Sequence, residues 1–193
     1  MKSNYELIAD EILSLYQQFG DEDYIGEPVS QLEHMSQCAQ LAIEQGYDNE
    51  VVLAAFFHDI GHMIEHITPV KHMDGYGIVD HEKLGADYLL SKGFSEKIAR
   101  LVNSHVNAKR YLTLQYPSYH AQLSEASKKT LEFQGGVMSA DEAIAFEDDD
   151  YFDLFIKLRR WDEAAKLEHV PVIDFELIRD RIVCHLKGET GER

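Results

Sequence analysis

The chain has 193 residues, of which 45% are hydrophobic and only two are cysteines, and its formal net charge is −17 at pH 7. This length fits one domain with a sizeable core, and two cysteines exclude a disulfide framework. The negative charge disfavours nucleic-acid binding, no apolar run reaches the roughly 20 residues that cross a bilayer, and no apolar signal-peptide segment is present. We therefore expect one cytoplasmic domain over residues 1–193, with neither nucleic acid nor membrane as a partner.

The N-terminal part of the chain shows apolar residues at helical spacing and no convincing alternating strand. A first helix is expected over residues 5–19, followed by a loop over residues 20–29. Ser30 and Glu33 have the spacing of a capping box, which predicts a second helix that ends near Gly46.

The next segment is the most apolar part of the chain. Residues 51–57 are apolar on every side, so we expect a buried central helix there, which Gly61 breaks or ends. Residues 63–79 show no helical pattern and are interpreted as a long loop. A loop of this length inside a compact domain is typical of functional or mobile segments.

The C-terminal half is again helical. Pro117 is expected to interrupt the pattern, and residues 188–193 to form a flexible tail. Helices are expected over residues 81–92, 96–114, 124–134, 139–167 with a break near 148–150, and 174–187. The predicted fold class is therefore all-α, a single helical bundle.

Four histidines and two aspartates in these helical contexts form a candidate metal site: His34, His58, Asp59, His81, His105 and Asp162. A lone histidine is more often a core or surface residue than a ligand. However, His58 and Asp59 directly follow the most buried helix, where an unpaired imidazole and carboxylate would be costly. Since adjacent helical residues point about 100° apart, they can share a metal only at one edge of the helix, and Asp59 has a second oxygen free to bridge.

The two remaining pairs of residues can complete two metal sites. His34 and Asp162 can join the first metal, and His81 and His105 the second, if helices from distant parts of the chain converge. Nitrogen and oxygen ligands without a thiolate suit iron, manganese or zinc.

The spacing of these residues resembles the HD-domain superfamily, which contains phosphohydrolases and a small group of diiron oxygenases. The flanking sequences are similar to the PhnZ/TmpB-type HD-domain mixed-valent diiron oxygenases over about residues 20–165. The strings that carry the resemblance are DYIGE (23–27), QLEH (31–34), HDIGH (58–62), HEKLGADYL (81–89), KRYL (109–112), SKKTLEFQGG (127–136) and RRWDE (159–163).

This resemblance implies a chemistry and a set of roles. The cofactor would be two Fe ions, Fe(II)/Fe(III), which use O2 to cleave the C–P bond of a small-molecule 1-hydroxyphosphonate. The substrate would be 2-amino-1-hydroxyethylphosphonate, giving glycine and phosphate, or its trimethylammonio analogue, giving glycine betaine and phosphate. Tyr24 and Glu27 would form a lid, with Tyr24 in the open iron position until the substrate arrives. The implied substrate-binding residues are His62, Lys109, Ser127, Thr130 and Arg159.

Helical spacing supports part of this assignment. Lys109 lies four residues after His105 and Arg159 three before Asp162, so each shares a face with a candidate ligand and can meet a phosphonate. Arg160 is expected to point elsewhere. Without the resemblance, simple packing of Tyr24 and a solvated Glu27 would be the favoured interpretation, and a surface position would explain Lys109 as well as a role in the site.

The loop that precedes His81 departs from the resemblance. Because it contains Glu65, Asp74 and Asp80, we expect it to meet the cationic end of the substrate, with a slight preference for the trimethylated compound. Two other functions stay open: a metal-dependent phosphohydrolase that activates water, and a metal-binding helical module without catalysis.

Overall fold

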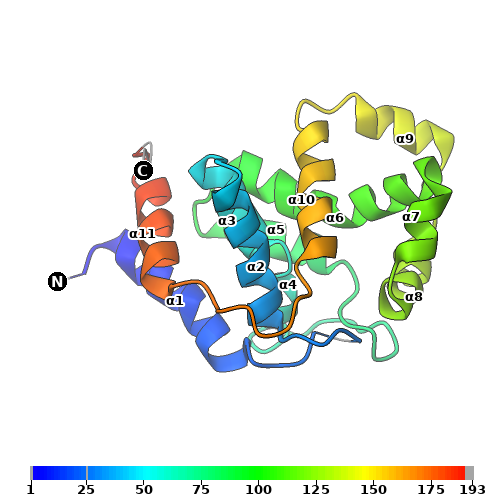
Figure 1. Ribbon diagram of the computed structural model, residues 1–193. Coiled ribbons are helices and arrows are strands. Elements are labelled where there is room, and N and C mark those ends of the chain that lie inside the picture. Colours follow the sequence, from blue (N-terminus) through cyan, green and yellow to red (C-terminus); the bar gives the residue numbers. More distant parts are fainter. Residues whose placement is uncertain (1, 25, 190–193) are drawn as a thin grey trace.

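The computed structural model describes residues 2–24 and 26–189, which form eleven α-helices and no β-strand (Figure 1). Two isolated β-bridges, Asp23 with Ser30 and His72 with Ile78, close the two long loops. The predicted all-α fold class is confirmed. The helices are α1 (Asn4–Phe19), α2 (Gln31–Glu44), α3 (Asn49–Phe57), α4 (Gly61–Ile64), α5 (His81–Ser91), α6 (Glu96–Gln115), α7 (Pro117–Gln122), α8 (Glu125–Phe133), α9 (Ala140–Glu147), α10 (Phe152–Ala164) and α11 (Phe175–Leu186).

Side-chain caps fix where several helices begin. The side chain of Ser30 accepts a hydrogen bond from the Glu33 N–H at 3.2 Å, and the Glu33 carboxylate accepts one from the Ser30 N–H at 2.7 Å. This confirms the predicted capping box, which satisfies backbone donors that the first helical turn leaves free. The start of α2 is therefore well defined, and α2 positions two side chains of the site.

The main core surrounds α3. Every residue from Val51 to Phe57 is buried, as the uniformly apolar sequence predicts. Helices α2, α6, α10 and α11 contact α3, and α1 lies beside α11 close to both chain ends (Figure 1). The candidate ligands lie around the C-terminal end of α3, so a fully buried helical segment supports them.

A second, smaller core lies at the other end of the molecule. Its buried side chains come from α6 and the α7–α9 region and are Tyr111, Leu112, Tyr119, Leu123, Met138 and Ala143. Figure 1 shows α7, α8 and α9 grouped together, away from α1 and α11. We call this group the small lobe. One wall of the candidate site comes from it, through α8.

Two elements differ from the prediction. Gly61 does not end α3, which stops at Phe57, but begins the short helix α4; a Cβ there would lie 2.0 Å from the His81 carbonyl oxygen, so the absence of a side chain permits this approach. Pro117 does not simply interrupt the pattern but begins α7, because proline fits the first helical position, where no N–H is needed. Of the predicted tail 188–193, residues 190–193 lie outside the described residues.

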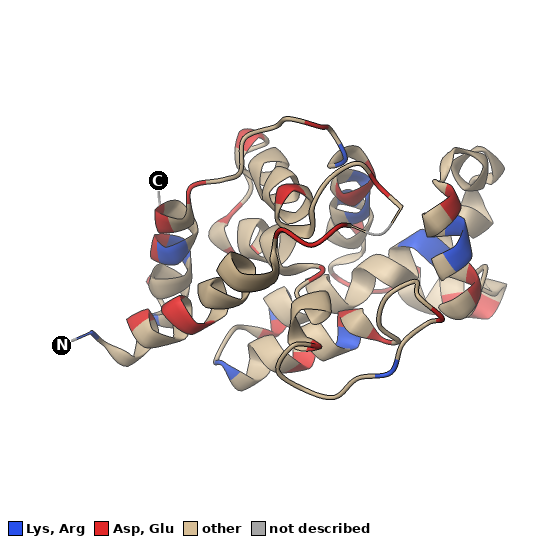
Figure 2. Cartoon of the chain, turned by 90° about the horizontal axis from the view of Figure 1, so that it is seen from below, with Lys and Arg blue, Asp and Glu red and all other residues tan. Residues whose placement is uncertain are grey.

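Acidic side chains are spread over most of the helices, whereas Lys and Arg are fewer (Figure 2). None of the helices built by residues 2–24 and 26–189 combines the length and apolarity needed to cross a lipid bilayer.

Candidate metal centre

Six buried side chains from five parts of the fold converge beside the end of α3. The turn between α3 and α4 carries His58 and Asp59, and four helices contribute one residue each. These are His34 from α2, His81 from α5, His105 from α6 and Asp162 from α10. All six predicted ligands are thus brought together.

The first group lies between α2, the turn after α3, and α10. The Nε2 atoms of His34 and His58 are 3.1 Å apart, and Asp162 Oδ1 lies 3.5 Å from His34 Nε2. Asp59 Oδ2 lies 3.3 Å from His58 Nε2 and 3.7 Å from His34 Nε2. Two imidazoles and two carboxylates therefore direct one donor atom each to a common point.

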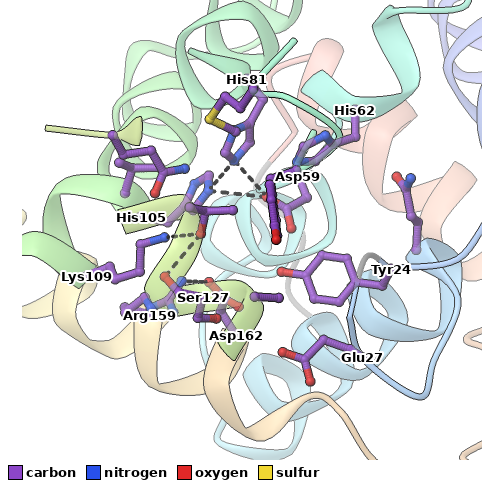
Figure 3. A pocket seen from close by; sticks show the side chains of 17 residues that line it. Tyr24, Glu27, Asp59, His62, His81, His105, Lys109, Ser127, Arg159 and Asp162 are labelled. Atoms are coloured by element: carbon purple, nitrogen blue, oxygen red, sulfur yellow. Dashed lines mark hydrogen bonds and ion pairs between the residues drawn. The ribbon is translucent and has the colours of Figure 1, made fainter. Parts of the chain in front are cut away.

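The second group shares Asp59 with the first. Asp59 Oδ1 lies 3.3 Å from His81 Nε2 and 3.2 Å from His105 Nε2, and these two nitrogens are 2.9 Å apart. Figure 3 shows His81 and His105 directed to Asp59 from one side. Because each oxygen of Asp59 faces a different histidine pair, its carboxylate has the arrangement of a bridge between two metal ions.

Hydrogen bonds to backbone carbonyls hold three of the imidazole rings. The Nδ1 atoms of His34, His58 and His105 lie 2.8, 2.9 and 2.8 Å from the carbonyl oxygens of Ala165, Ala55 and Val102. A neutral ring that donates from Nδ1 presents an unprotonated Nε2 to the centre, as metal ligation requires.

The charges and unpaired atoms of the centre fit a pair of cations. Burial opposes ionisation of Asp59, but His58 and hydrogen bonds from the surrounding histidines outweigh it and hold the pKa of Asp59 well below its usual range. Burial acts likewise on Asp162, where Arg159 and His34 keep the pKa low. Asp162 Oδ1 is buried and has no hydrogen-bond partner among the described residues. A buried anionic oxygen without a donor is costly, and a metal ion would satisfy it.

Cys38 lies next to this donor set, one turn after His34 on α2. Its sulfur is within 4.8 Å of ligand atoms of His34 and His58. Burial, with Asp162 and Asp59 nearby, raises the pKa of the Cys38 thiol well above its usual value. The sequence interpretation did not anticipate this neighbour, although its spacing from His34 is a recognisable signal.

A cavity opens over the centre, and Tyr24 and Glu27 line one side of it (Figure 3). The Tyr24 ring stacks on His34, with ring centroids 4.0 Å apart. Burial, with Asp59 and Asp162 close by, raises the pKa of Tyr24 well above its usual value. The Glu27 carboxylate accepts a hydrogen bond from Lys166 at 2.8 Å, a partner that the sequence interpretation missed.

The opposite side of the cavity is cationic and hydroxylic. Lys109 is buried, and its Nζ donates to Thr130 Oγ1 at 2.9 Å, while Ser127 lies one turn before Thr130 on α8. Burial, with Arg159 nearby, lowers the pKa of Lys109 to about 7. The predicted approach of Lys109 from the face of His105 agrees with this placement, because both residues line the cavity.

Arg159 also lines the cavity, but its guanidinium is engaged within the protein. It donates to the carboxylates of Asp162 and Glu163, and its Nε donates to the Tyr119 hydroxyl at 2.9 Å. Arg160, in contrast, is exposed and lies over the Tyr119 ring. It is not among the residues that line the cavity, in agreement with the prediction that it points elsewhere. The structure therefore places Arg159 behind Asp162 as its hydrogen-bond donor.

His62 stacks on His81, with ring centroids 4.3 Å apart, and faces the cavity. Burial, with His81 nearby, lowers the pKa of His62 to about 3, so the ring is neutral. Gln31 also lines the cavity; its side-chain Oε1 is buried and finds no hydrogen-bond partner within residues 2–24 and 26–189. The sequence interpretation assigned Gln31 no role, although it lies one turn before His34.

The acidic residues of the loop before His81 do not lie at the cavity, where the sequence predicted them. The acidic residues Glu65, Asp74 and Asp80 do not line the cavity, and Glu65 instead lies 3.6 Å from the His72 imidazole. The loop presents Met73 and Tyr76 to the cavity. This wall is apolar and aromatic because the loop's charged side chains remain at the solvent side.

Comparisons with known proteins identify close relatives of the chain. The HD domain family matches residues 32–142. An uncharacterized protein of Acanthamoeba polyphaga mimivirus is 45% identical over 93% of this chain and 82% of its own length. The 1-hydroxy-2-(trimethylamino)ethylphosphonate dioxygenase (glycine-betaine-forming) of Leisingera caerulea is 38% identical over 90% of this chain and 88% of its own. The hydroxymethylphosphonate dioxygenase of Gimesia maris is 34% identical over 87% of this chain and 84% of its own length.

Proposed function

Because the chain belongs to the HD-domain family, and within it to the PhnZ/TmpB-type oxygenases, we propose that this oxidoreductase uses O2 to cleave the C–P bond of a 1-hydroxyphosphonate. The observation that carries the proposal is the position of Asp59, whose two oxygens face two separate histidine pairs. In this proposal His34, His58, Asp59 and Asp162 hold one iron, and Asp59, His81 and His105 hold the other. The Fe(II)/Fe(III) pair supplies the redox chemistry with O2 when it is bound.

The residues of the chain bind and orient the substrate. Lys109 offers a cation to the phosphonate, next to the hydroxyls of Thr130 and Ser127, on the side of the cavity that α6 and α8 form. Arg159 adds positive charge behind Asp162 and neutralises part of the acidic centre. Together these groups would fix the phosphonate end, with the carbon that bears the hydroxyl toward Asp59.

The other end of the substrate would face the apolar and aromatic wall. Met73 and Tyr76 offer an aliphatic thioether and a ring face, which suit a trimethylammonium group that has no N–H to donate. A primary amine would leave its hydrogen bonds unmade against these two side chains. We therefore propose the trimethylammonio compound as the preferred substrate, with glycine betaine and phosphate as products.

Turnover assays with three substrates test this function. The iron-loaded enzyme would be incubated with the trimethylammonio, primary-amine and hydroxymethyl phosphonates, with and without O2, and phosphate release measured. We expect release that requires O2 and is fastest for the trimethylammonio compound. Release without O2, or turnover of a phosphate ester alone, would instead favour the phosphohydrolase. A strong preference for the primary amine would reject the proposed substrate but keep the reaction.

A further inference from the structure

Lys166 lies beside the cavity and forms an ion pair with Glu27. The roles proposed above for the metal ligands and the substrate-binding residues do not explain this ion pair. Lys166 follows the end of α10 by two residues and Asp162 by four. Its Nζ lies 2.8 Å from Glu27 Oε1, and the two side chains are only 14% and 10% exposed. Because this ion pair is largely shielded from solvent, its attraction is screened less than that of a surface pair. It is therefore expected to hold the two side chains together more strongly than an exposed pair would.

The segment that carries Lys166 is fixed to α2 on both sides. The Ala165 carbonyl accepts the hydrogen bond from His34 Nδ1 at 2.8 Å. The side chain of Gln37 binds both backbone groups of Leu167, at 2.9 and 3.1 Å. Lys166 therefore extends from a rigid base that also orients a candidate ligand.

The other partner of the ion pair is coupled to Tyr24. The Glu27 N–H donates to the Tyr24 carbonyl at 2.9 Å, and the Tyr24 N–H donates to the Val29 carbonyl at 3.0 Å. The Lys166 Nζ also lies 6.0 Å from the centroid of the Tyr24 ring. A force that holds Glu27 in place thus also holds Tyr24 against His34.

From these contacts we propose that Lys166 is a positioning residue whose ion pair with Glu27 holds the Tyr24–Glu27 turn against the metal centre. Its effect on substrate affinity rests on the proposed function, because Tyr24 and Glu27 line the cavity that the phosphonate would enter. The effect on the turn itself does not depend on the reaction. Lys166 is not among the residues that line the cavity, so it would act through the lining residues Glu27 and Tyr24.

Hydrogen exchange of the iron-loaded protein without substrate tests this positioning. In Lys166→Met, backbone amides of a peptide that spans residues 20–30 are expected to exchange about three- to tenfold faster than in the wild type. Lys97→Met is the matched control, because Lys97 is 18% exposed and binds Asp48 at 2.7 Å, away from the cavity. We expect the control to leave exchange in residues 20–30 unchanged.

Two further variants protect the test against a general loss of stability. Lys166→Arg keeps the charge and is expected to keep wild-type exchange in residues 20–30. The swapped pair Glu27→Lys with Lys166→Glu is expected to restore at least half of the protection lost in Lys166→Met. Wild-type exchange in Lys166→Met, or faster exchange in Lys166→Arg equal to that of Lys166→Met, would overturn the proposal.

Substrate binding adds a second readout. Lys166→Met is expected to change the KM for the 1-hydroxyphosphonate at least about threefold while kcat changes less, because the reacting groups are untouched. A loss of kcat of about threefold or more with an unchanged KM would reject the effect on substrate affinity. If the wild type turns over no phosphonate but Lys166→Met still speeds exchange, the proposed function fails and the positioning role stands. If the wild type turns over the phosphonate and Lys166→Met leaves exchange unaltered, the positioning role of Lys166 is rejected and the proposed function stands.

Discussion

Arg159 and Asp162 lie one turn apart on α10, and the guanidinium of Arg159 binds one carboxylate oxygen of Asp162. The other oxygen is buried and has no hydrogen-bond partner in the part of the chain that the structure describes. The hydrogen bond leaves the free oxygen directed at His34, 3.5 Å away. Arg159 therefore selects which oxygen of Asp162 is available to a metal ion. This arrangement gives Arg159 a role in the centre itself, besides any contact with a phosphonate.

Replacement of Arg159 by methionine is expected to weaken metal binding at the site of His34 and Asp162 by about 10- to 100-fold, the usual effect of losing a group that orients a ligand. The measurement is competition with a chelator of known affinity. Arg160→Met is the control, because Arg160 is exposed and only covers the Tyr119 ring. Equal affinities in both variants would mean that Asp162 needs no orientation from Arg159.

Asp59→Asn is expected to reduce the metal content from two ions to fewer than one per chain. The amide offers one weak oxygen donor where the carboxylate offers two, so both histidine groups lose their shared ligand. His81→Ala should remove only one ion. Elemental analysis after gel filtration measures both, and Asp87→Asn, which alters an exposed pair with Lys83, should retain two ions. Two ions in Asp59→Asn would contradict the bridging arrangement.

Phosphonate binding is expected to take up a proton above pH 7. Burial, with Arg159 nearby, lowers the pKa of Lys109 to about 7, so above that pH the amine is mostly neutral before binding. A bound anion favours the ammonium form and raises this pKa, so the affinity falls as the pH rises through 7. Asp162, Asp59 and Glu82 act in the opposite direction to burial but do not outweigh it.

Anaerobic calorimetry at pH 8, in two buffers that differ in ionisation enthalpy, measures this proton uptake. Lys109→Met should bind more weakly and lose the part of the uptake that belongs to Lys109. Titration of the substrate itself is common to both proteins and cancels in the difference. Identical uptake in the two proteins would show that Lys109 does not change its protonation on binding.

Gly26→Ala is expected to lower kcat/KM more than tenfold with a folded protein. Gly26 has a φ of 78°, and a Cβ there would lie 2.6 Å from the Ala126 Cβ on α8, so the turn that carries Tyr24 and Glu27 would be pushed off α8. Gly46→Ala is a close control, since Gly46 has a φ of 73° but open space around it. Both variants should lose about 1 kcal/mol of stability from the unfavourable φ. Similar kcat/KM values in the two variants would show that the contact with Ala126 is unimportant.

Local sequence signals were sufficient for most helices. Helical spacing and the capping serines fix the starts of α2, α6 and α9, because these depend on residues only three positions apart. The same rules could not identify α7, where Pro117 was interpreted as an interruption although proline also suits the first turn of a helix.

The candidate site divides in a similar way. The six donor residues could be identified because their types, spacing and flanking sequences carry a signal, and the structure brings all six together. The ion pair of Lys166 with Glu27 joins residues 139 positions apart, and nothing in either neighbourhood predicts it. The acidic residues of the loop before His81 were expected at the cavity, yet burial of Met73 and Ile78 turns the loop's apolar side inward. Which face of an irregular loop packs inward is decided by tertiary contacts, which a sequence pattern of this kind does not contain.

The small lobe shares a second hydrophobic cluster with the C-terminal part of α6, and Phe146 packs against both this cluster and the core around α3. Ser127 and Thr130 extend from the small lobe, whereas all six donor residues belong to the turn after α3 or to helices that contribute side chains to the main core. Substitutions on α8 are therefore expected to change one wall of the cavity while leaving the six donor residues in place. This division predicts that an exchange of residues 117–136 between relatives would alter the lining of the cavity without replacing any of the six donor residues.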